Sequence, residues 1–150
     1  MARMELRSPA FGNQEPIPSR HSKEGGNLSP PLEWSGVPDG TAELVLLCED
    51  PDAPGGTFVH WVLAGIDPAL AGLAEGETPP GAVEGHNDFG DDGYGGPRPP
   101  EGDDPHRYFF TLYAASEPLG LSPGASADEL RTALQGKDLA SATLVGTYQR

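Results

Sequence analysis

Two aspartates and two histidines are the side chains of this 150-residue sequence that are best suited to hold a ligand. Asp50 and Asp52 stand in a DPDAP segment, His60 follows shortly after it, and His106 opens an HRY tripeptide. An imidazole has an unperturbed pKa near 6.5, so a neighbouring anion can hold it protonated, and a carboxylate can orient it. All four side chains are also metal-ligand types. The residues therefore offer anion binding or, as the alternative, a metal-dependent hydrolase.

Three apolar runs must position these side chains, and each is predicted to be a buried strand. They cover Glu43–Glu49, Thr57–Ile66 and Arg107–Ala115. Pro38-Asp39-Gly40 is a turn signal before the first run. The DPDAPGG segment, residues 50–56, ends that run and separates it from the second.

A polar group stands on an apolar face of each strand, or just beyond its end. Asp50 continues the face of the first strand, and His106 lies two residues before Tyr108 on a face of the third. His60 is predicted to share its face with Val62, Ala64 and Ile66. Alone, each has a simpler explanation: a turn former, a satisfied core histidine and an exposed histidine. Together, on neighbouring strands, they are predicted to converge in one pocket, because an unpaired buried polar group costs about 1–3 kcal/mol.

The stretch from Tyr94 to Tyr108, YGGPRPPEGDDPHRY, is predicted to be a shaped loop beside that pocket. Glycine allows close backbone approach, while proline fixes φ and removes a hydrogen-bond donor. The loop delivers His106 and Tyr108 to the mouth of the third strand. Its glycine N–H groups are predicted to form a concave nest of donors for an anion.

The remaining elements are short and fit one domain over residues 1–150. Ser126 and Glu129 form a capping box that begins a helix, and Gly136 is a natural stop. Residues 12–31 and 67–85 are predicted to be loops, the first followed by Trp34 as an anchor in the core. An edge strand and a last strand are predicted over Met4–Arg7 and Ala142–Tyr148.

Composition favours a loop-rich β protein and excludes some functions. The chain has 21 glycines and 17 prolines, and its formal net charge is −14. Without a basic stripe to neutralise phosphates, neither nucleic-acid binding nor attachment to an anionic membrane surface is expected. The single cysteine, Cys48, excludes an internal disulfide. No apolar run resembles a signal peptide or reaches the roughly 20 residues of a membrane span, so a cytoplasmic location is expected.

Four stretches resemble the phosphatidylethanolamine-binding protein family, and specifically its bacterial Raf-kinase-inhibitor-like branch. They are GGNLSPPLEW (Gly25–Trp34), DPDAPGGTFVHW (Asp50–Trp61), GYGGPRPPEGDDPHRYFFTLYA (Gly93–Ala114) and LVGTYQR (Leu144–Arg150). The resemblance implies a mainly β fold, an antiparallel Greek-key sandwich with one or two short C-terminal helices. It also implies a ligand pocket lined by Asp50, Asp52, Pro54, His60, Gly95, Gly96, Pro97, Pro99, Pro100, His106 and Tyr108.

The resemblance further implies a non-catalytic protein that needs no cofactor. Its pocket would accept phosphate-like or carboxylate groups, such as a phospholipid head group, a nucleotide or a phosphorylated side chain. An alternative compatible with the same fold and pocket is a protein-interaction module that regulates a protein kinase or protease through the pocket rim, and a homodimer is compatible with this branch. Arg98 stands where the bacterial pattern often has a small residue or cysteine, and it adds a cation near the mouth. Anion binding is expected to weaken above neutral pH, as the histidines lose their protons.

Overall fold

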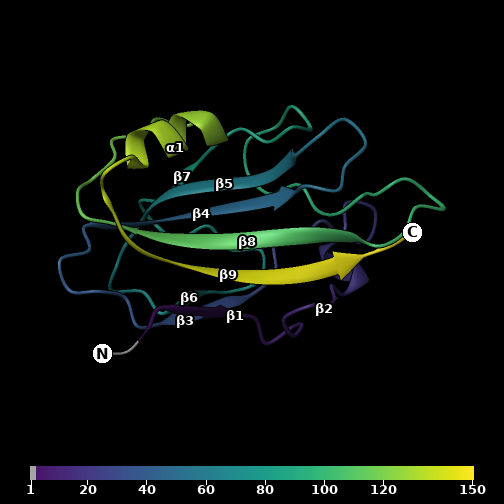
Figure 1. Cartoon of the computed structure of the whole chain (residues 1–150), viewed down its shortest axis with the longest axis horizontal. Coiled ribbons are helices and arrows are strands. Elements are labelled where there is room, and N and C mark those ends of the chain that lie inside the picture. The colour runs from purple at the N-terminus through teal and green to yellow at the C-terminus, as the bar shows by residue number, and fades with distance from the viewer. Residues whose placement is uncertain (1–2) are drawn as a thin grey trace.

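The structure, a computed structural model, describes residues 3–150, which form two β-sheets and one α-helix (Figure 1). The large sheet has six strands in the order β2 (Glu15–Pro16), β9 (Asp138–Tyr148), β8 (His106–Ala115), β4 (Glu43–Asp50), β5 (Phe58–Ile66) and β7 (Val83–Glu84). The small sheet has three, in the order β1 (Glu5–Arg7), β3 (Leu32–Ser35) and β6 (Gly72–Leu73). All neighbours are antiparallel except β2 and β9, which are parallel.

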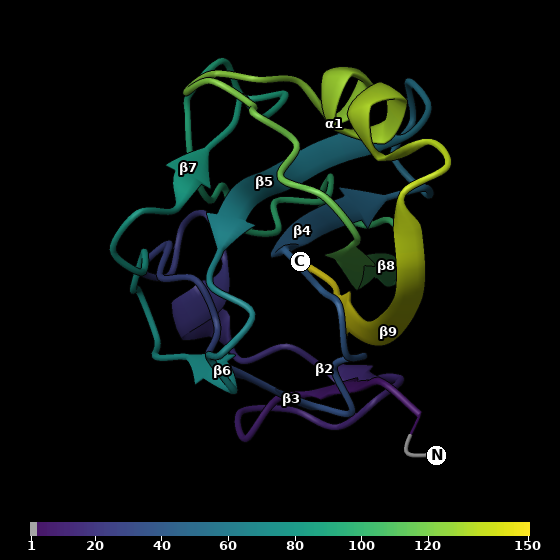
Figure 2. The ribbon, with the colours of Figure 1, turned by 90° about the vertical axis from the view of Figure 1, so that its left-hand side faces the viewer.

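The main core lies between the two sheets, where strand periodicity puts every second side chain. In β4, Leu44, Leu46 and Cys48 face this core, whereas Val45 and Leu47 face the opposite side. The α-helix α1 (Ala127–Leu134) and a 3₁₀ helix, η1 (Ser19–His21), complete the described elements. Figure 2 shows the small sheet and α1 on opposite sides of the large sheet. The predicted mainly β fold with one short C-terminal helix is therefore confirmed.

Helix α1 begins where the capping box predicts. The Ser126 side chain accepts a hydrogen bond from the backbone of Glu129, whose own side chain accepts from the backbone of Ser126. Leu130 and Leu134 are buried against the outer face of the large sheet. The helix ends at Leu134, two residues before the predicted stop at Gly136.

Two irregularities in the pairing of β4 with β5 overturn one prediction about side-chain direction. The register shifts once between Leu44 and Leu46, and again between Cys48 and Glu49. At the second shift Cys48 pairs with Trp61 and Glu49 with Val59, so His60 is the extra residue of a β-bulge. A bulge re-aims the side chain of the extra residue, which strict alternation cannot anticipate.

As a result, His60 does not share a face with Val62, Ala64 and Ile66. Val62 and Ala64 pack under α1, and Ile66 lies in the core between the sheets. His60 instead lies at the end of the large sheet beside Tyr108. The prediction for this face was therefore wrong, because the sequence pattern does not show the bulge.

The connecting segments contain more structure than their turn-rich sequences indicate. Residues 12–31 include β2 and η1, and residues 67–85 include β6 and β7. Trp34 is buried in β3, as predicted, and its indole N–H donates to the carbonyl of Leu70 at 2.7 Å. The last strand, β9, begins at Asp138, four residues before its predicted start.

Candidate functional site

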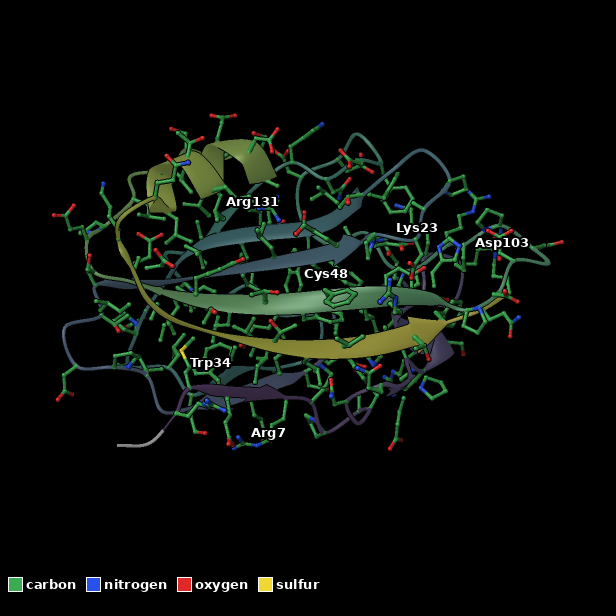
Figure 3. All side chains as sticks on the ribbon, viewed as in Figure 1. Arg7, Lys23, Trp34, Cys48, Asp103 and Arg131 are labelled. Carbon is green, nitrogen blue, oxygen red and sulfur yellow. The ribbon has the colours of Figure 1, made fainter. Side chains whose placement is uncertain are left out.

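The ends of three central strands meet at one end of the large sheet. Because β4 is antiparallel to β5 and β8, the last residue of β4 lies beside the first residues of its two neighbours. A cavity of about 190 Å³ opens there. Its walls are formed by Asp50, Ala53, Pro54, Phe58, His60, Phe89, Arg98, Pro99, Pro100, His106 and Tyr108. In Figure 3 the labelled side chains of Lys23 and Asp103 mark this end of the molecule.

His106 is held between two carboxylates. Its Nδ1 lies 2.6 Å from Oδ2 of Asp50, and its Nε2 lies 3.1 Å from Oδ2 of Asp103. The other oxygen of Asp50 accepts the backbone N–H of Asp52 at 2.7 Å. Burial lowers the pKa of His106, but the hydrogen bonds to the two carboxylates outweigh burial, so its pKa is raised. The protonated ring can donate through both nitrogens at once.

His60 has very different neighbours. Its Nδ1 lies 2.7 Å from the carbonyl oxygen of Gly95, which can only accept, so the proton is assigned to Nδ1. The ring packs against three aromatic rings, those of Phe58, Phe89 and Tyr108, at centroid distances of 4.9, 5.4 and 5.1 Å. Burial lowers the pKa of His60, although the Gly95 carbonyl opposes this shift. Nε2 forms no hydrogen bond within residues 3–150 and can meet a ligand.

The hydroxyl of Tyr108 is buried without a hydrogen-bond partner in the described part of the chain. Burial raises the pKa of this phenol, so it keeps its proton and remains a donor. A buried polar group without a partner costs about 1–3 kcal/mol. Tyr108 forms part of the cavity wall, but its hydroxyl oxygen is itself buried, so a ligand accepts from it and recovers that free energy only if the wall shifts.

Asp52 was predicted to lie in the pocket, but it does not line the cavity. Its carboxylate accepts from the Arg107 guanidinium at 2.9 and 2.8 Å and from the Arg107 backbone N–H at 2.9 Å. The side-chain hydrogen bond to Arg107 lowers the pKa of Asp52 to about 2. This clamp ties the DPDAP segment to the start of β8, so Asp52 fixes the distance between Asp50 and His106.

Gly95 and Gly96 shape the rim, but they do not form the predicted donor nest. The N–H of Gly95 donates to the carbonyl of His60 at 2.9 Å, and the N–H of Gly96 donates to the Asn27 side chain at 2.7 Å. A Cβ on Gly96 would lie 2.1 Å from the carbonyl oxygen of His21, so only glycine allows these two loops to meet. Both N–H groups therefore already have hydrogen-bond partners within the chain. What the glycines contribute is the lack of a side chain, which lets the two loops approach closely.

The predicted prolines divide into two groups. Pro54, Pro99 and Pro100 line the cavity, whereas Pro97 does not, and its carbonyl accepts the backbone N–H of Lys23 at 2.9 Å. Arg98 lines the cavity and also pairs with Glu24, at 3.3 Å. Glu24 accepts from Arg150 as well, at 2.6 Å, and Arg150 donates to the carbonyl of Pro99 at 2.6 Å. The predicted cation near the mouth is thus part of a network that holds the rim.

Four residues that shape the site were not predicted from the sequence. Phe58 lies two residues before His60, and the alternation along a strand could have suggested a shared wall. Ala53 lies within the DPDAP segment, but its small apolar side chain gives no chemical signal. Phe89 and Asp103 stand in loops, where no periodicity shows which side chain turns inward. Their contacts depend on tertiary structure alone.

Comparison with known proteins identifies the family. The model of the phosphatidylethanolamine-binding protein family matches residues 7–149. The chain belongs to this family. A UPF0098 protein of Methanothermobacter thermautotrophicus is 47% identical, and the alignment covers 98% of this chain and 99% of that protein. The crystal structure of Escherichia coli YbcL, described as a member of the mammalian family, has a TM-score of 0.93 at 33% identity, with 99% of each chain covered.

A more distant likeness shows the fold alone. The carboxypeptidase Y inhibitor, solved in complex with its cognate proteinase, is 17% identical, with a TM-score of 0.56 over 97% of this chain and 82% of that one. The sequence-based assignment to the phosphatidylethanolamine-binding protein family is confirmed by the family match and by the similarity to YbcL.

Two further findings concern the described residues of this family member. No helix in residues 3–150 is long and apolar enough to span a membrane. Within the same residues, no three or more His, Cys, Asp or Glu side chains are grouped so that they could hold a metal ion. Of the four residues proposed for a metal-dependent hydrolase, Asp52 is held by Arg107 and points its oxygens at that guanidinium.

Proposed function

We propose that this protein is a non-catalytic binding protein whose cavity takes a small phosphoryl or carboxylate group. The observation that carries the proposal is the meeting of three polar rings, His60, His106 and Tyr108, around one small cavity. One of these rings has a raised pKa, one has a nitrogen free for a ligand, and one carries an unpartnered hydroxyl. Protonated His106 supplies a positive charge to the ligand, and the Nε2 of neutral His60 accepts from the O–H of a phosphate monoanion or another protonated group.

The size of the cavity limits what can enter it. Its volume of about 190 Å³ lies below the roughly 300 Å³ at which drug-sized pockets begin. A phosphoryl or carboxylate group with a short substituent fits this volume. The rest of a phospholipid, a nucleotide or a phosphorylated peptide would extend past Pro99 and Pro100 to the surface.

The acidic surroundings are compatible with an anion because the nearest carboxylate is already matched. Asp50 is bonded to His106, so its charge is offset by a protonated ring. The net charge of −14 acts mainly on long-range approach, whereas binding depends on the donors within the site. The match to a family named for phosphatidylethanolamine binding supports a binding role.

Calorimetry and NMR titration with inorganic phosphate and with phosphoethanolamine test the proposal at pH 6. We expect His60→Ala to weaken binding of both at least tenfold, because it removes a ring of the cavity wall whose Nε2 is free to accept from the ligand. His86→Ala is the matched control, since His86 is half exposed and bonds Asp92 away from the cavity. Binding that is undetectable in the wild type, or equal in the two variants, would refute the anion site.

A third arm of the experiment separates the sources of the phosphoryl group. Vesicles that contain phosphatidylethanolamine present the same head group on a membrane, whereas phosphoethanolamine presents it free. Binding to the free compound without binding to vesicles would assign the pocket to soluble ligands. A kinase or protease partner and a cytoplasmic location stay predictions, and pull-down with wild type and His106→Ala would show whether any partner depends on the pocket.

A further inference from the structure

Asp103 occupies the outward-facing nitrogen of His106. Its carboxylate lies 3.1 Å from Nε2, while Asp50 holds Nδ1 at 2.6 Å. His106 forms part of the wall of the 190 Å³ cavity and also of a second, outer hollow of about 510 Å³, whose walls are Asp52, Asp103, Asp104, Pro105, His106 and Arg107. Both hydrogen-bonding positions of this imidazole are thus taken by carboxylates of the chain itself.

The two carboxylates differ in how firmly they are held. The Asp50 side chain is 4% exposed and belongs to β4, whereas that of Asp103 is 42% exposed and belongs to a loop. The backbone hydrogen bonds of this loop are long: Asp103 to Pro100 at 3.3 Å, and Gly102 to Arg150 at 3.4 Å. Asp103 can therefore turn toward water at a small cost, while Asp50 cannot leave without unpairing a buried charge.

We propose that Asp103 acts as an internal anion that competes with the ligand, occupying the His106 donor until a phosphoryl or carboxylate group displaces it. This inference rests on the proposed function of the cavity. With Asp103 in place, a protonated His106 is shared between two carboxylates, and an entering phosphoryl group adds further negative charge beside them. Displacement moves the Asp103 carboxylate away from the charge of the ligand. The free energy that this displacement costs lowers the affinity for the ligand. Asp103 thus lowers the affinity by the same factor for every anion that needs this donor.

The test compares two variants that remove the same charge from adjacent positions. Asp103→Asn removes the carboxylate that contacts His106, whereas Asp104→Asn removes one that lines the same outer hollow and forms no hydrogen bond to that ring within residues 3–150. The probe is inorganic phosphate, titrated by calorimetry at pH 6, where Asp50 still favours a protonated His106. We expect about tenfold tighter binding for Asp103→Asn, equal to about 1.4 kcal/mol, and less than a twofold change for Asp104→Asn.

Each other pattern contradicts the proposal in a recognisable way. Equal tightening in both variants would show an effect of net charge alone. Unchanged or weaker phosphate binding in Asp103→Asn, with binding intact in the wild type, would refute the competition and leave the anion site standing. If the wild type does not bind phosphate, the proposed function fails and this inference fails with it.

A second measurement needs no variant. The side-chain ¹³C signal of Asp103 in the wild type reports whether its carboxyl group leaves His106 when phosphate saturates the protein. We expect this signal to move toward that of an exposed aspartate such as Asp104. A signal that stays in place while phosphate binds would mean that the ligand does not displace Asp103.

Discussion

The two walls of the cavity place a buried histidine in opposite electrostatic surroundings. His60, on β5, is 3% exposed and His106, on β8, is 4% exposed, and burial lowers the pKa of both rings. Aromatic rings surround His60, and its pKa is lowered, whereas two carboxylates hold His106, and its pKa is raised. The difference shows that two carboxylate partners can outweigh burial and reverse the direction in which the pKa of a buried imidazole moves.

This difference bears directly on what the cavity can bind. At pH 6.5 the wall of His106 offers mainly a cation, because its pKa is raised, while the wall of His60 offers mainly a neutral ring with a free Nε2. A phosphate monoanion presents both a charged oxygen and an O–H group, so it can meet both walls at once. A site with two equally basic histidines would not present a cation on one wall and a neutral ring on the other.

The largest effect is expected from removal of the partner that gives the His106 wall its character. In Asp50→Ala the protonated His106 loses its shortest hydrogen bond, at 2.6 Å, inside the protein. Breaking a buried ion pair from one side costs about 3–5 kcal/mol of stability, because the remaining charge stays buried without its partner. Urea unfolding at pH 6 measures this loss.

A double-mutant cycle shows whether the loss belongs to the pair. Asp50→Ala combined with His106→Leu is expected to cost clearly less than the sum of the two single variants. Additive losses, or a loss below about 1 kcal/mol for Asp50→Ala, would mean that the two walls do not differ in the way described.

The pH dependence of stability is expected to have a separate branch for each wall. The pKa of His106 is raised above 6.5, so its contribution is complete below pH 6.5 and is lost as the pH rises through the folded-state value. The pKa of His60 is lowered, so the unfolded state takes up a proton first and stability falls as the pH drops below about 6.5. Over the range where only histidines titrate, stability should therefore be greatest near pH 6.5.

Unfolding by urea between pH 5.5 and 8 checks this curve, and NMR titration of the two rings checks its cause. His106→Gln should flatten the branch above pH 6.5, and His60→Gln the branch below it. Two ring pKa values on the same side of 6.5 would contradict the comparison, whatever the shape of the stability curve.

Much of this arrangement is visible in the sequence, and the part that is not depends on strand pairing and loop contacts. Alternation placed Tyr108 and His106 on one face of β8, and the capping box of Ser126 and Glu129 placed the start of α1. The direction of His60 was missed, because a β-bulge depends on the pairing of β5 with β4 and leaves no mark in the period of β5 alone. Asp103 was missed for a related reason: its contact with His106 depends on how a loop closes.

Asp52 shows the same limit in another form. Its motif and residue type fit a ligand site, but only the structure shows that Arg107 takes both of its oxygens. The N–H groups of Gly95 and Gly96 are a similar case, because they donate to the His60 carbonyl and the Asn27 side chain, which are distant in sequence. Residue types and their order were thus predictable, and the allocation of hydrogen bonds among them was not.

The smallest effect on stability is expected from Asp52→Ala. The comparison with Asp50→Ala is informative because the two aspartates are only two residues apart. The Arg107 side chain is 51% exposed and that of Asp52 is 29% exposed, so water screens their ion pair and takes over its hydrogen bonds when it is lost. We expect a drop in Tm of about 2 °C or less at pH 7.

Because the pKa of Asp52 is lowered to about 2, its contribution to stability is present above pH 3.8 and disappears as the pH falls through 2. Differential scanning calorimetry of both variants at pH 7 and pH 3 measures this. A loss for Asp52→Ala as large as that for Asp50→Ala would show that the clamp on the DPDAP segment, and not the buried carboxylate, holds the His106 wall together.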